Sequence, residues 1–212
     1  MNKLIKEIKS LKDSSIKNKV DQRLKEFKNF KNKDTKEWFS ELCFCILTAN
    51  SKAATALKIQ EELTPKGFCE YSLDNISKTI RKNKHRFHNN KAEYILAARE
   101  HIDIKDKIIG LIKEKDEKNA REWLVDNIKG LGFKESSHFL RNVGYKNLAI
   151  LDRHVLNLMK EYNIIKEKPK TLNKKKYLEI EKTFKKIANT LKMSCAELDL
   201  YVWYMKTGKV LK

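Results

Sequence analysis

A lysine and an aspartate eighteen residues apart carry side chains suited to covalent chemistry at an electrophilic carbon. Lys134 stands in the first turn of an expected helix over Lys134–Asn142, where the helix dipole and partial burial both disfavour an ammonium. We therefore expect a neutral, nucleophilic amine at Lys134. Asp152 precedes a second expected helix, over Arg153–Tyr162, and is placed to cap it. A capping carboxylate stays ionised and can also face a developing cation, so the two roles are compatible.

Two glycines immediately precede the lysine, in the stretch Ile-Lys-Gly-Leu-Gly-Phe over residues 128–133. Gly130 and Gly132 allow a tight turn and a close approach of another backbone. The free amides of the following helix, together with Lys129, suit a phosphate group. These features predict a helix-hairpin-helix motif over about 117–143, which would grip a DNA backbone without reading bases. An ordinary glycine-rich connection between two helices is the alternative.

The charge balance also favours nucleic acid. Lysine and arginine total 47 against 28 acidic residues, giving a formal charge of +19. Such a surface attracts a polyanion, and each Lys or Arg can neutralise a phosphate. A membrane surface is a competing partner, but no apolar run approaches the roughly 18 residues of a spanning helix, and Met1–Lys12 lacks a signal-peptide pattern. A lysine-rich composition without ligand meaning is the third interpretation. We expect a cytoplasmic, nucleoid-associated protein with no membrane partner.

The cysteine pattern argues against a metal centre. Cys43, Cys45, Cys69 and Cys195 match no zinc or iron–sulfur ligand spacing, so we expect no metal and no cofactor. The first two lie in the apolar run Trp38–Leu47 and are expected in the core. Free thiols are consistent with a reducing cytoplasm.

Helical periodicity runs through most of the chain, and no segment alternates as a half-buried strand does. We expect an all-α protein: one domain over residues 1–212, with two helical lobes flanking a cleft. Asp34 with Glu37, and Ser194 with Glu197, predict helix starts. The basic segment Lys166–Lys176 is expected to be a loop or a crossing between lobes. Besides the two helices named above, helices are expected over Glu37–Leu47, Ser51–Leu63, Leu73–Lys82, Lys91–Glu100, Lys105–Lys115, Glu117–Ile128, Leu172–Leu191 and Cys195–Met205.

The stretch Asn127–His154 resembles the helix-hairpin-helix/Gly-Pro-Asp superfamily of DNA glycosylases, and within it the archaeal-type 8-oxoguanine DNA glycosylase/lyase family. The similarity also covers Glu41–Asn50, Arg86–Leu96 and the tail Ala196–Lys212. One departure stands out: Ile150 and Leu151 occupy the Gly-Pro positions before the aspartate. We expect that loop to be shaped differently, although the aspartate itself remains.

The resemblance implies roles for single residues. Lys134 matches the lysine that attacks the anomeric carbon and forms a Schiff base, and Asp152 matches the carboxylate that supports its activation and stabilises an oxocarbenium-like transition state. His154 falls where the superfamily contacts a phosphate. Asn50 matches a position that contacts the estranged base, and Arg86 is placed to enter the gap in the stack. Each of these last two residues is otherwise a surface polar group at a helix boundary.

The resemblance also suggests a pocket for the flipped base. Phe87 lies in Arg81–Lys91, a stretch with five positive residues and no acid, which suits stacking on nucleic acid. Trp203 lies nearly opposite the apolar stripe of the last helix. These two aromatics would wall the base, and Lys212 with its carboxylate would enter the pocket, where an acceptor selects the N7–H of 8-oxoguanine. The alternatives are that Phe87 anchors the core, that Trp203 only packs inside the protein, and that Lys212 belongs to a frayed tail.

The expected function is therefore bifunctional: excision of 8-oxoguanine from double-stranded DNA by a monomer, followed by AP lyase cleavage through β-elimination. No redox cofactor or catalytic metal is needed. One rival is a glycosylase of the same fold that acts on another damaged base. The other is a non-enzymatic helix-hairpin-helix DNA-binding protein, which needs the hairpin glycines but neither Lys134 nor Asp152.

Overall fold

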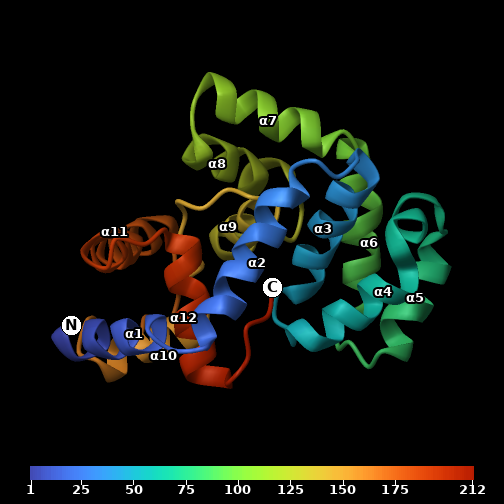
Figure 1. The fold of residues 1–212 in the computed structure, drawn as a ribbon. Coiled ribbons are helices and arrows are strands. Elements are labelled where there is room, and N and C mark those ends of the chain that lie inside the picture. Colours follow the sequence, from blue (N-terminus) through green and yellow to red (C-terminus); the bar gives the residue numbers. More distant parts are fainter. The chain divides into compact units, whose positions relative to one another are not determined.

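The computed structural model describes all 212 residues and consists of twelve α-helices, one short 3-10 helix and no β-strand, which confirms the all-α prediction (Figure 1). Most expected helices are present, with ends displaced by a few residues. The helices are α1 (Asn2–Lys12), α2 (Ile16–Phe30), α3 (Thr35–Thr48), α4 (Ala53–Glu70), α5 (Leu73–Lys82), α6 (His88–Ala98), η1 (Arg99–His101), α7 (Ile104–Glu114), α8 (Glu117–Asn127), α9 (Phe133–Asn142), α10 (Arg153–Glu161), α11 (Lys174–Thr190) and α12 (Cys195–Thr207).

The chain forms two compact units. Unit 1 combines Met1–Lys31 with Leu140–Lys212, and unit 2 is the continuous segment Asn32–Phe139. The boundary between residues 139 and 140 falls inside α9. The basic segment around Pro169 is a loop up to residue 173 and lies wholly in unit 1. The prediction of a loop is therefore confirmed, and the alternative of a crossing between lobes is wrong.

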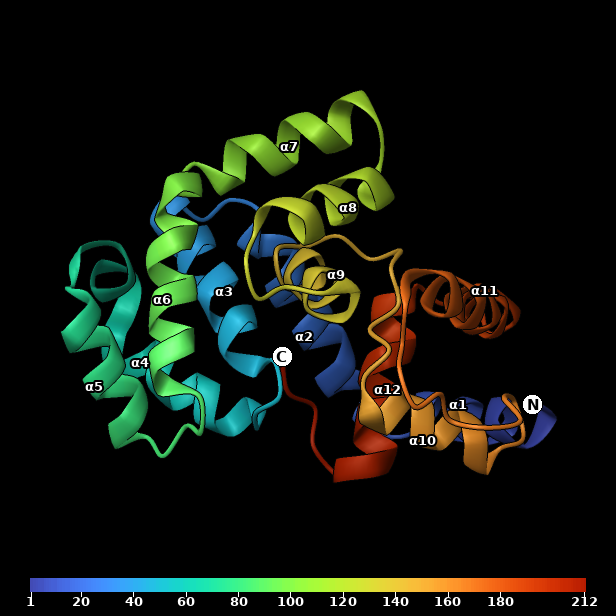
Figure 2. The same cartoon turned by 180° about the vertical axis from the view of Figure 1, so that it is seen from behind.

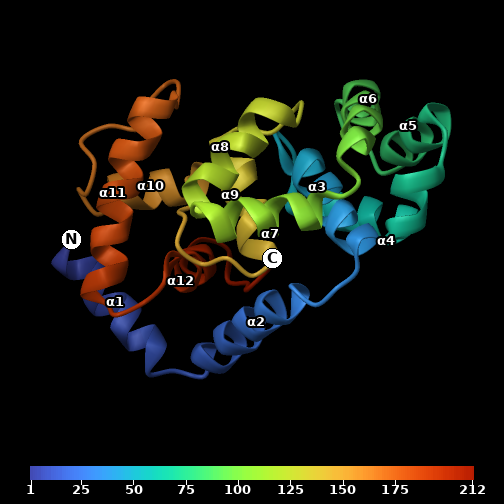
Figure 3. The same cartoon turned by 90° about the horizontal axis from the view of Figure 1, so that it is seen from above.

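Unit 1 is organised around α12, which packs against α1, α2, α10 and α11. Seven of its first eight residues are buried, so the buried surface is wider than the single apolar stripe expected from the sequence. The sequence reading assigned no element to the first thirty residues, yet they form α1 and α2, joined by a turn at residues 13–15 (Figure 3). The signal was present: Leu4 and Ile8 on α1, and Ile16 and Val20 on α2, are spaced by four and buried.

Unit 2 is built on α3, which contacts α4, α6 and α7, while α7 and α8 run side by side (Figure 2). Every residue from Trp38 to Thr48 is buried, which confirms α3 as a central helix. Helix α4 runs further than expected, with a break at Thr64, whose φ is 58°. Pro65 explains the break, because proline excludes the helical conformation from the residue before it.

The helix starts predicted at Asp34 and Ser194 are confirmed. The Asp34 side chain accepts a hydrogen bond from the Glu37 amide at 2.8 Å, and the Ser194 hydroxyl accepts one from the Glu197 amide at 3.1 Å. Cys43 and Cys45 are fully buried free thiols, as expected. None of the helices combines the length and the hydropathy that a bilayer crossing requires.

Candidate active site

The hairpin between α8 and α9 has the geometry that its glycines predict. Gly130 has a φ of 91°, and a Cβ there would lie 2.4 Å from the Tyr94 ring. Both the backbone conformation and the lack of space therefore favour glycine. The Leu131 amide donates to the Ile128 carbonyl at 3.2 Å and closes the turn. Lys129 is exposed, with its Nζ 5.4 Å from the centre of the Tyr94 ring. The predicted helix-hairpin-helix motif is therefore present, with α8 and α9 as its helices.

Lys134 lies in the first turn of α9, one residue after the helix begins. Its side chain is 25% exposed, and its Nζ lies 2.9 Å from Glu135 Oε1. This contact is an ion pair between two partly exposed side chains, and the neutral, nucleophilic amine expected at Lys134 stays a prediction.

Two buried basic groups, Lys91 and His85, lie at the end of α3 and were not among the predicted site residues. Lys91 is only 5% exposed and donates to the Ile46 carbonyl at 2.7 Å. Burial lowers the pKa of Lys91 to about 8, an effect that Glu135 opposes and Lys134 reinforces. His85 Nε2 lies 3.0 Å from the Leu47 carbonyl, and burial lowers the pKa of His85. Both side chains thus satisfy carbonyls at the C-terminal end of α3.

Within the basic stretch Arg81–Lys91, the Lys91 side chain is buried and its charge is not presented to a ligand. Phe87 is half-buried at the start of α6, and its amide donates to His85 Nδ1 at 3.2 Å. Arg86 is exposed, with its guanidinium 4.3 Å from the Phe87 ring centre. Asn50 is exposed just beyond α3, with a φ of 59°. His85 connects these groups, because it contacts both the end of α3 and the start of α6.

Asp152 caps α10 in unit 1, as predicted. Its Oδ1 accepts a hydrogen bond from the Val155 amide at 2.8 Å. The loop before it is anchored by α11: the Tyr177 hydroxyl donates to the Ala149 carbonyl at 2.7 Å, and Glu181 Oε1 accepts from the Ala149 amide at 3.0 Å. These side-chain contacts hold the loop in place without the Gly-Pro pair of the superfamily.

A buried ion pair lies close to this carboxylate. Arg141 Nη1 is 2.7 Å from Asp199 Oδ2, and both side chains are less than a tenth exposed. Burial raises the pKa of Asp199, the Asp152 carboxylate raises it further, and Arg141 opposes both. The two partners are 58 residues apart in the chain, so no local sequence pattern indicates the pair.

Of the predicted base-pocket residues, Trp203 and Lys212 lie in unit 1 with Asp152, whereas Phe87 lies in unit 2. His154 and Trp203 meet edge to face, with ring centroids 4.9 Å apart. Trp203 is half-buried, and its Nε1 is buried without a hydrogen-bond partner. Gly208, with a φ of 69°, ends α12 in the left-handed conformation and begins the tail to Lys212, which is half-buried.

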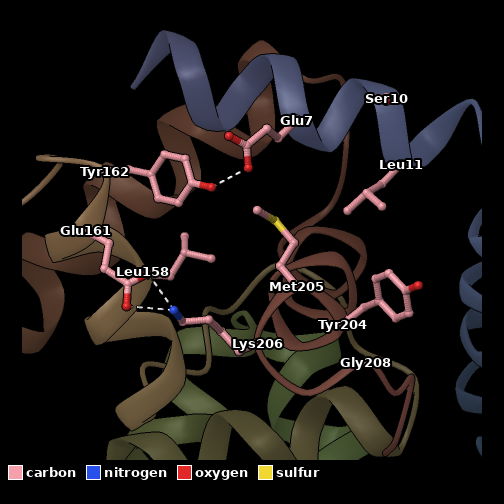
Figure 4. A pocket seen from close by; sticks show the side chains of 10 residues that line it. All are labelled: Glu7, Ser10, Leu11, Leu158, Glu161, Tyr162, Tyr204, Met205, Lys206 and Gly208. Atoms are coloured by element: carbon pink, nitrogen blue, oxygen red, sulfur yellow. Dashed lines mark hydrogen bonds and ion pairs between the residues drawn. The ribbon is translucent and has the colours of Figure 1, made fainter.

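One hollow of unit 1 lies away from these residues. It has a volume of about 700 Å³ and lies between α1, α10 and the end of α12 (Figure 4). The Tyr162 hydroxyl donates to Glu7 across it, and Lys206 donates to Glu161 at 2.7 Å. None of the predicted site residues lines it.

The predicted residues therefore fall into two groups. One group lies in unit 2 and comprises Asn50, Arg86, Phe87, Lys129, Gly130, Gly132 and Lys134. The other lies in unit 1 and comprises Asp152, His154, Trp203 and Lys212. No cluster of three or more His, Cys, Asp or Glu side chains is arranged to hold a metal ion.

Comparison with known proteins points to one family. The model of the Ogg-HhH family, described as 8-oxoguanine DNA glycosylase, matches residues 20–193. An 8-oxoguanine DNA glycosylase/AP lyase of Methanocaldococcus jannaschii is 51% identical over 209 residues and covers 99% of each chain. The corresponding Thermotoga maritima protein is 42% identical over the full length of both.

Solved structures agree with this match. The M. jannaschii 8-oxoguanine glycosylase/lyase in complex with a 15mer DNA containing 8-oxoguanine superposes with a TM-score of 0.95, at 50% identity over 99% of each chain. An endonuclease III–DNA complex, at 20% identity and a TM-score of 0.53, shares the fold alone.

Proposed function

Because the chain belongs to the Ogg-HhH family of 8-oxoguanine DNA glycosylases, we propose that it excises 8-oxoguanine with Lys134 as nucleophile and Asp152 as carboxylate partner. The chain is a DNA glycosylase with AP lyase activity, a base excision repair enzyme. The observation that carries the residue assignment is the amine of Lys134, partly exposed in the first turn after a hairpin suited to a DNA phosphate.

The chemistry follows from these two groups acting on one extruded nucleotide. The Lys134 amine, after losing a proton, attacks C1′ as the bond to the base breaks, and the base leaves protonated. The Asp152 carboxylate stabilises the positive charge that develops on the sugar. Ring opening gives an imine, whose formation acidifies the C2′ proton. Loss of that proton expels the 3′ phosphate by β-elimination, and water then releases the lysine.

The remaining predicted residues have binding roles in this proposal. Phe87 and Trp203 stack on the flipped base, and Lys212 with its terminal carboxylate accepts the N7–H that distinguishes 8-oxoguanine from guanine. Asn50 contacts the base left behind, while Arg86 fills the gap in the stack.

The hairpin supplies the grip on the double helix. The amides around Gly130 and Gly132, together with Lys129 and His154, bind phosphates of double-stranded DNA. The enzyme works as a monomer without a membrane partner, in the cytoplasm and associated with the nucleoid.

Borohydride trapping on a panel of lesion-containing duplexes tests the proposal. The wild-type protein should form a covalent adduct on 8-oxoguanine DNA in preference to duplexes with oxidised pyrimidines or mismatched adenine. Lys134→Gln should form none, since an amide cannot make an imine. Lys129→Gln is the matched control: it weakens DNA binding but should still trap at saturating DNA. Equal trapping by Lys134→Gln would remove Lys134 from the mechanism, and a preference for another lesion would overturn the substrate.

A further inference from the structure

The positive charge of the chain is divided unevenly between the two units. Unit 1 holds 27 lysines and arginines against 11 acidic residues, a net charge of +16. Unit 2, which contains the hairpin and Lys134, holds 20 against 17, a net charge of +3. A lysine-rich composition alone would leave both units strongly basic, whereas unit 2 balances its basic residues with acids. The surplus in unit 1 therefore needs a separate explanation.

Much of this surplus lies in the loop before α11 and in α11 itself. Residues 166–186 contain nine lysines and three acidic residues. One side of α11 packs against α12, and its buried residues include Tyr177, Ile180 and Phe184. Exposed lysines lie on the opposite side of the helix and in the loop. Those that form the α11 lysine surface are Lys166, Lys168, Lys170, Lys175, Lys182 and Lys186.

Three lysines of this surface are not neutralised by neighbouring acids. Lys175, Lys182 and Lys186 are spaced by seven and four residues, so they share the side of α11 opposite to its buried residues. Both carboxylates of the helix pair with other lysines of α11, at 2.9 Å and 3.6 Å. None of the three lysines forms an ion pair. Like charges four residues apart destabilise a helix, so the stability of α11 does not account for this arrangement.

Duplex DNA is the partner that this surface fits. From Lys175 to Lys186 the helix rises about 16 Å, at roughly 1.5 Å per residue. Along that length a duplex presents about ten phosphate charges, one per ~1.7 Å of its axis. The three ammonium groups can therefore contact separate phosphates, and each contact releases condensed counterions. The chain belongs to a family of DNA glycosylases, so its working partner carries such a backbone.

We propose that the α11 lysine surface is a second contact with the backbone of duplex DNA, in addition to the hairpin of unit 2. The contact is independent of sequence, because phosphates carry no direct information about the bases. It raises the affinity for undamaged and damaged duplexes alike and takes no part in the chemistry. The inference goes beyond the proposed function, since it requires neither a lesion nor the nucleophile.

Salt-dependent binding to a long undamaged duplex tests the proposal. The triple variant with Lys175→Gln, Lys182→Gln and Lys186→Gln removes the unpaired charges of α11. Its plot of log affinity against log salt concentration should be shallower than that of wild type by about two to three, close to one for each lost phosphate contact. Its affinity should fall about tenfold or more at about 0.1 M salt.

A matched variant keeps the change in net charge the same. Lys113, Lys115 and Lys118 are exposed lysines of unit 2 that are interspersed with acidic residues. Replacing all three by Gln removes three charges as well, yet the salt slope should change by less than about 0.5. Replacing the three α11 lysines by Arg, which keeps their charge, should retain the wild-type slope.

Several results would overturn the second contact. Equal slopes for wild type and the α11 Gln variant would show that DNA does not bind there, and equal losses in both Gln variants would assign the effect to net charge alone. Weaker binding to vesicles of anionic lipid with unchanged DNA binding would assign the surface to a membrane.

The chemistry provides the last check. Single-turnover excision with saturating 8-oxoguanine DNA should be unchanged in the α11 Gln variant, and a slower reaction would contradict a contact that only binds. The binding test uses undamaged DNA, so a failure of the proposed function would appear separately, as absent borohydride trapping by the wild type.

Discussion

Helices α9 and α10 each begin beside a side chain of the proposed site, Lys134 at α9 and Asp152 at α10. At α10 the Asp152 carboxylate faces the positive end of the helix and accepts the Val155 amide, so dipole and hydrogen bond both stabilise it. At α9 the Lys134 side chain lies at the same end of a helix, and its Nζ contacts the Glu135 carboxylate at 2.9 Å. A helix start favours a negative group and disfavours a positive one, so a nearby carboxylate offsets the dipole there.

The two helix starts therefore differ in what surrounds the proposed reactive group. Asp152 accepts a hydrogen bond from an amide of its own helix, whereas Lys134 contacts the carboxylate of the neighbouring Glu135.

Replacing Asp152 by Asn, which removes the carboxylate at the start of α10, should have the largest effect. Asparagine caps a helix about as well as aspartate, so stability should change by less than about 1 kcal/mol. Loss of the charge opposite the developing cation should slow excision about a hundredfold or more. Single-turnover excision and urea unfolding measure the two effects. Asp34→Asn, at the cap of α3, is the matched control and should alter neither; excision within threefold of wild type in Asp152→Asn would remove the carboxylate from the mechanism.

Replacing Arg141 by Met tests the ion pair that lies near Asp152. Asp199 would be left buried and unpaired, which should lower the free energy of unfolding by about 3 kcal/mol. The sign of the pH dependence follows from the raised pKa of Asp199, which makes the folded state bind a proton more readily than the unfolded chain. The loss should therefore be greatest at pH 8 and smaller at pH 5. A loss that is equal at both values would argue against an ionised Asp199.

Replacing Lys91 by Met tests the buried amine on α6, whose effect appears only as a dependence of stability on pH. In the folded protein the pKa of Lys91 is about 8, against 10.5 ordinarily. Below pH 8 the cost of burying the ammonium is present in full, and it disappears as the pH rises from 8 to 10.5, because only the unfolded chain still holds the proton. Over that window the unfolding free energy of wild type should gain about 3 kcal/mol on that of Lys91→Met. A constant difference would mean that Lys91 is not desolvated.

Much of the fold was predictable because its signals are local. The caps at Asp34, Asp152 and Ser194 each act within one turn of helix, and the positive φ of Gly130 belongs to a single residue. Helices α1 and α2 were missed because their apolar residues are few and set among many lysines. The break in α4 follows from Pro65, whose effect on Thr64 was overlooked.

The site was predictable only in part, because only some of its contacts are local in the sequence. Lys134 and Asp152 stand beside recognisable turns, and the spacing from Gly132 to Glu135 is that of a capping box, so Glu135 was within reach of sequence reasoning. Lys91 and Arg141 were not. Their partners lie 45 and 58 residues away, and only the packed helices bring them together.

Locating the trapped adduct tests the central claim most directly. After borohydride reduction with 8-oxoguanine DNA and removal of the oligonucleotide, peptide mass spectrometry should find the deoxyribose remnant on Lys134 and on no other amine. A remnant on Met1, Lys91 or Lys212 instead would contradict the account, because the nucleophile would then lie outside the first turn of α9.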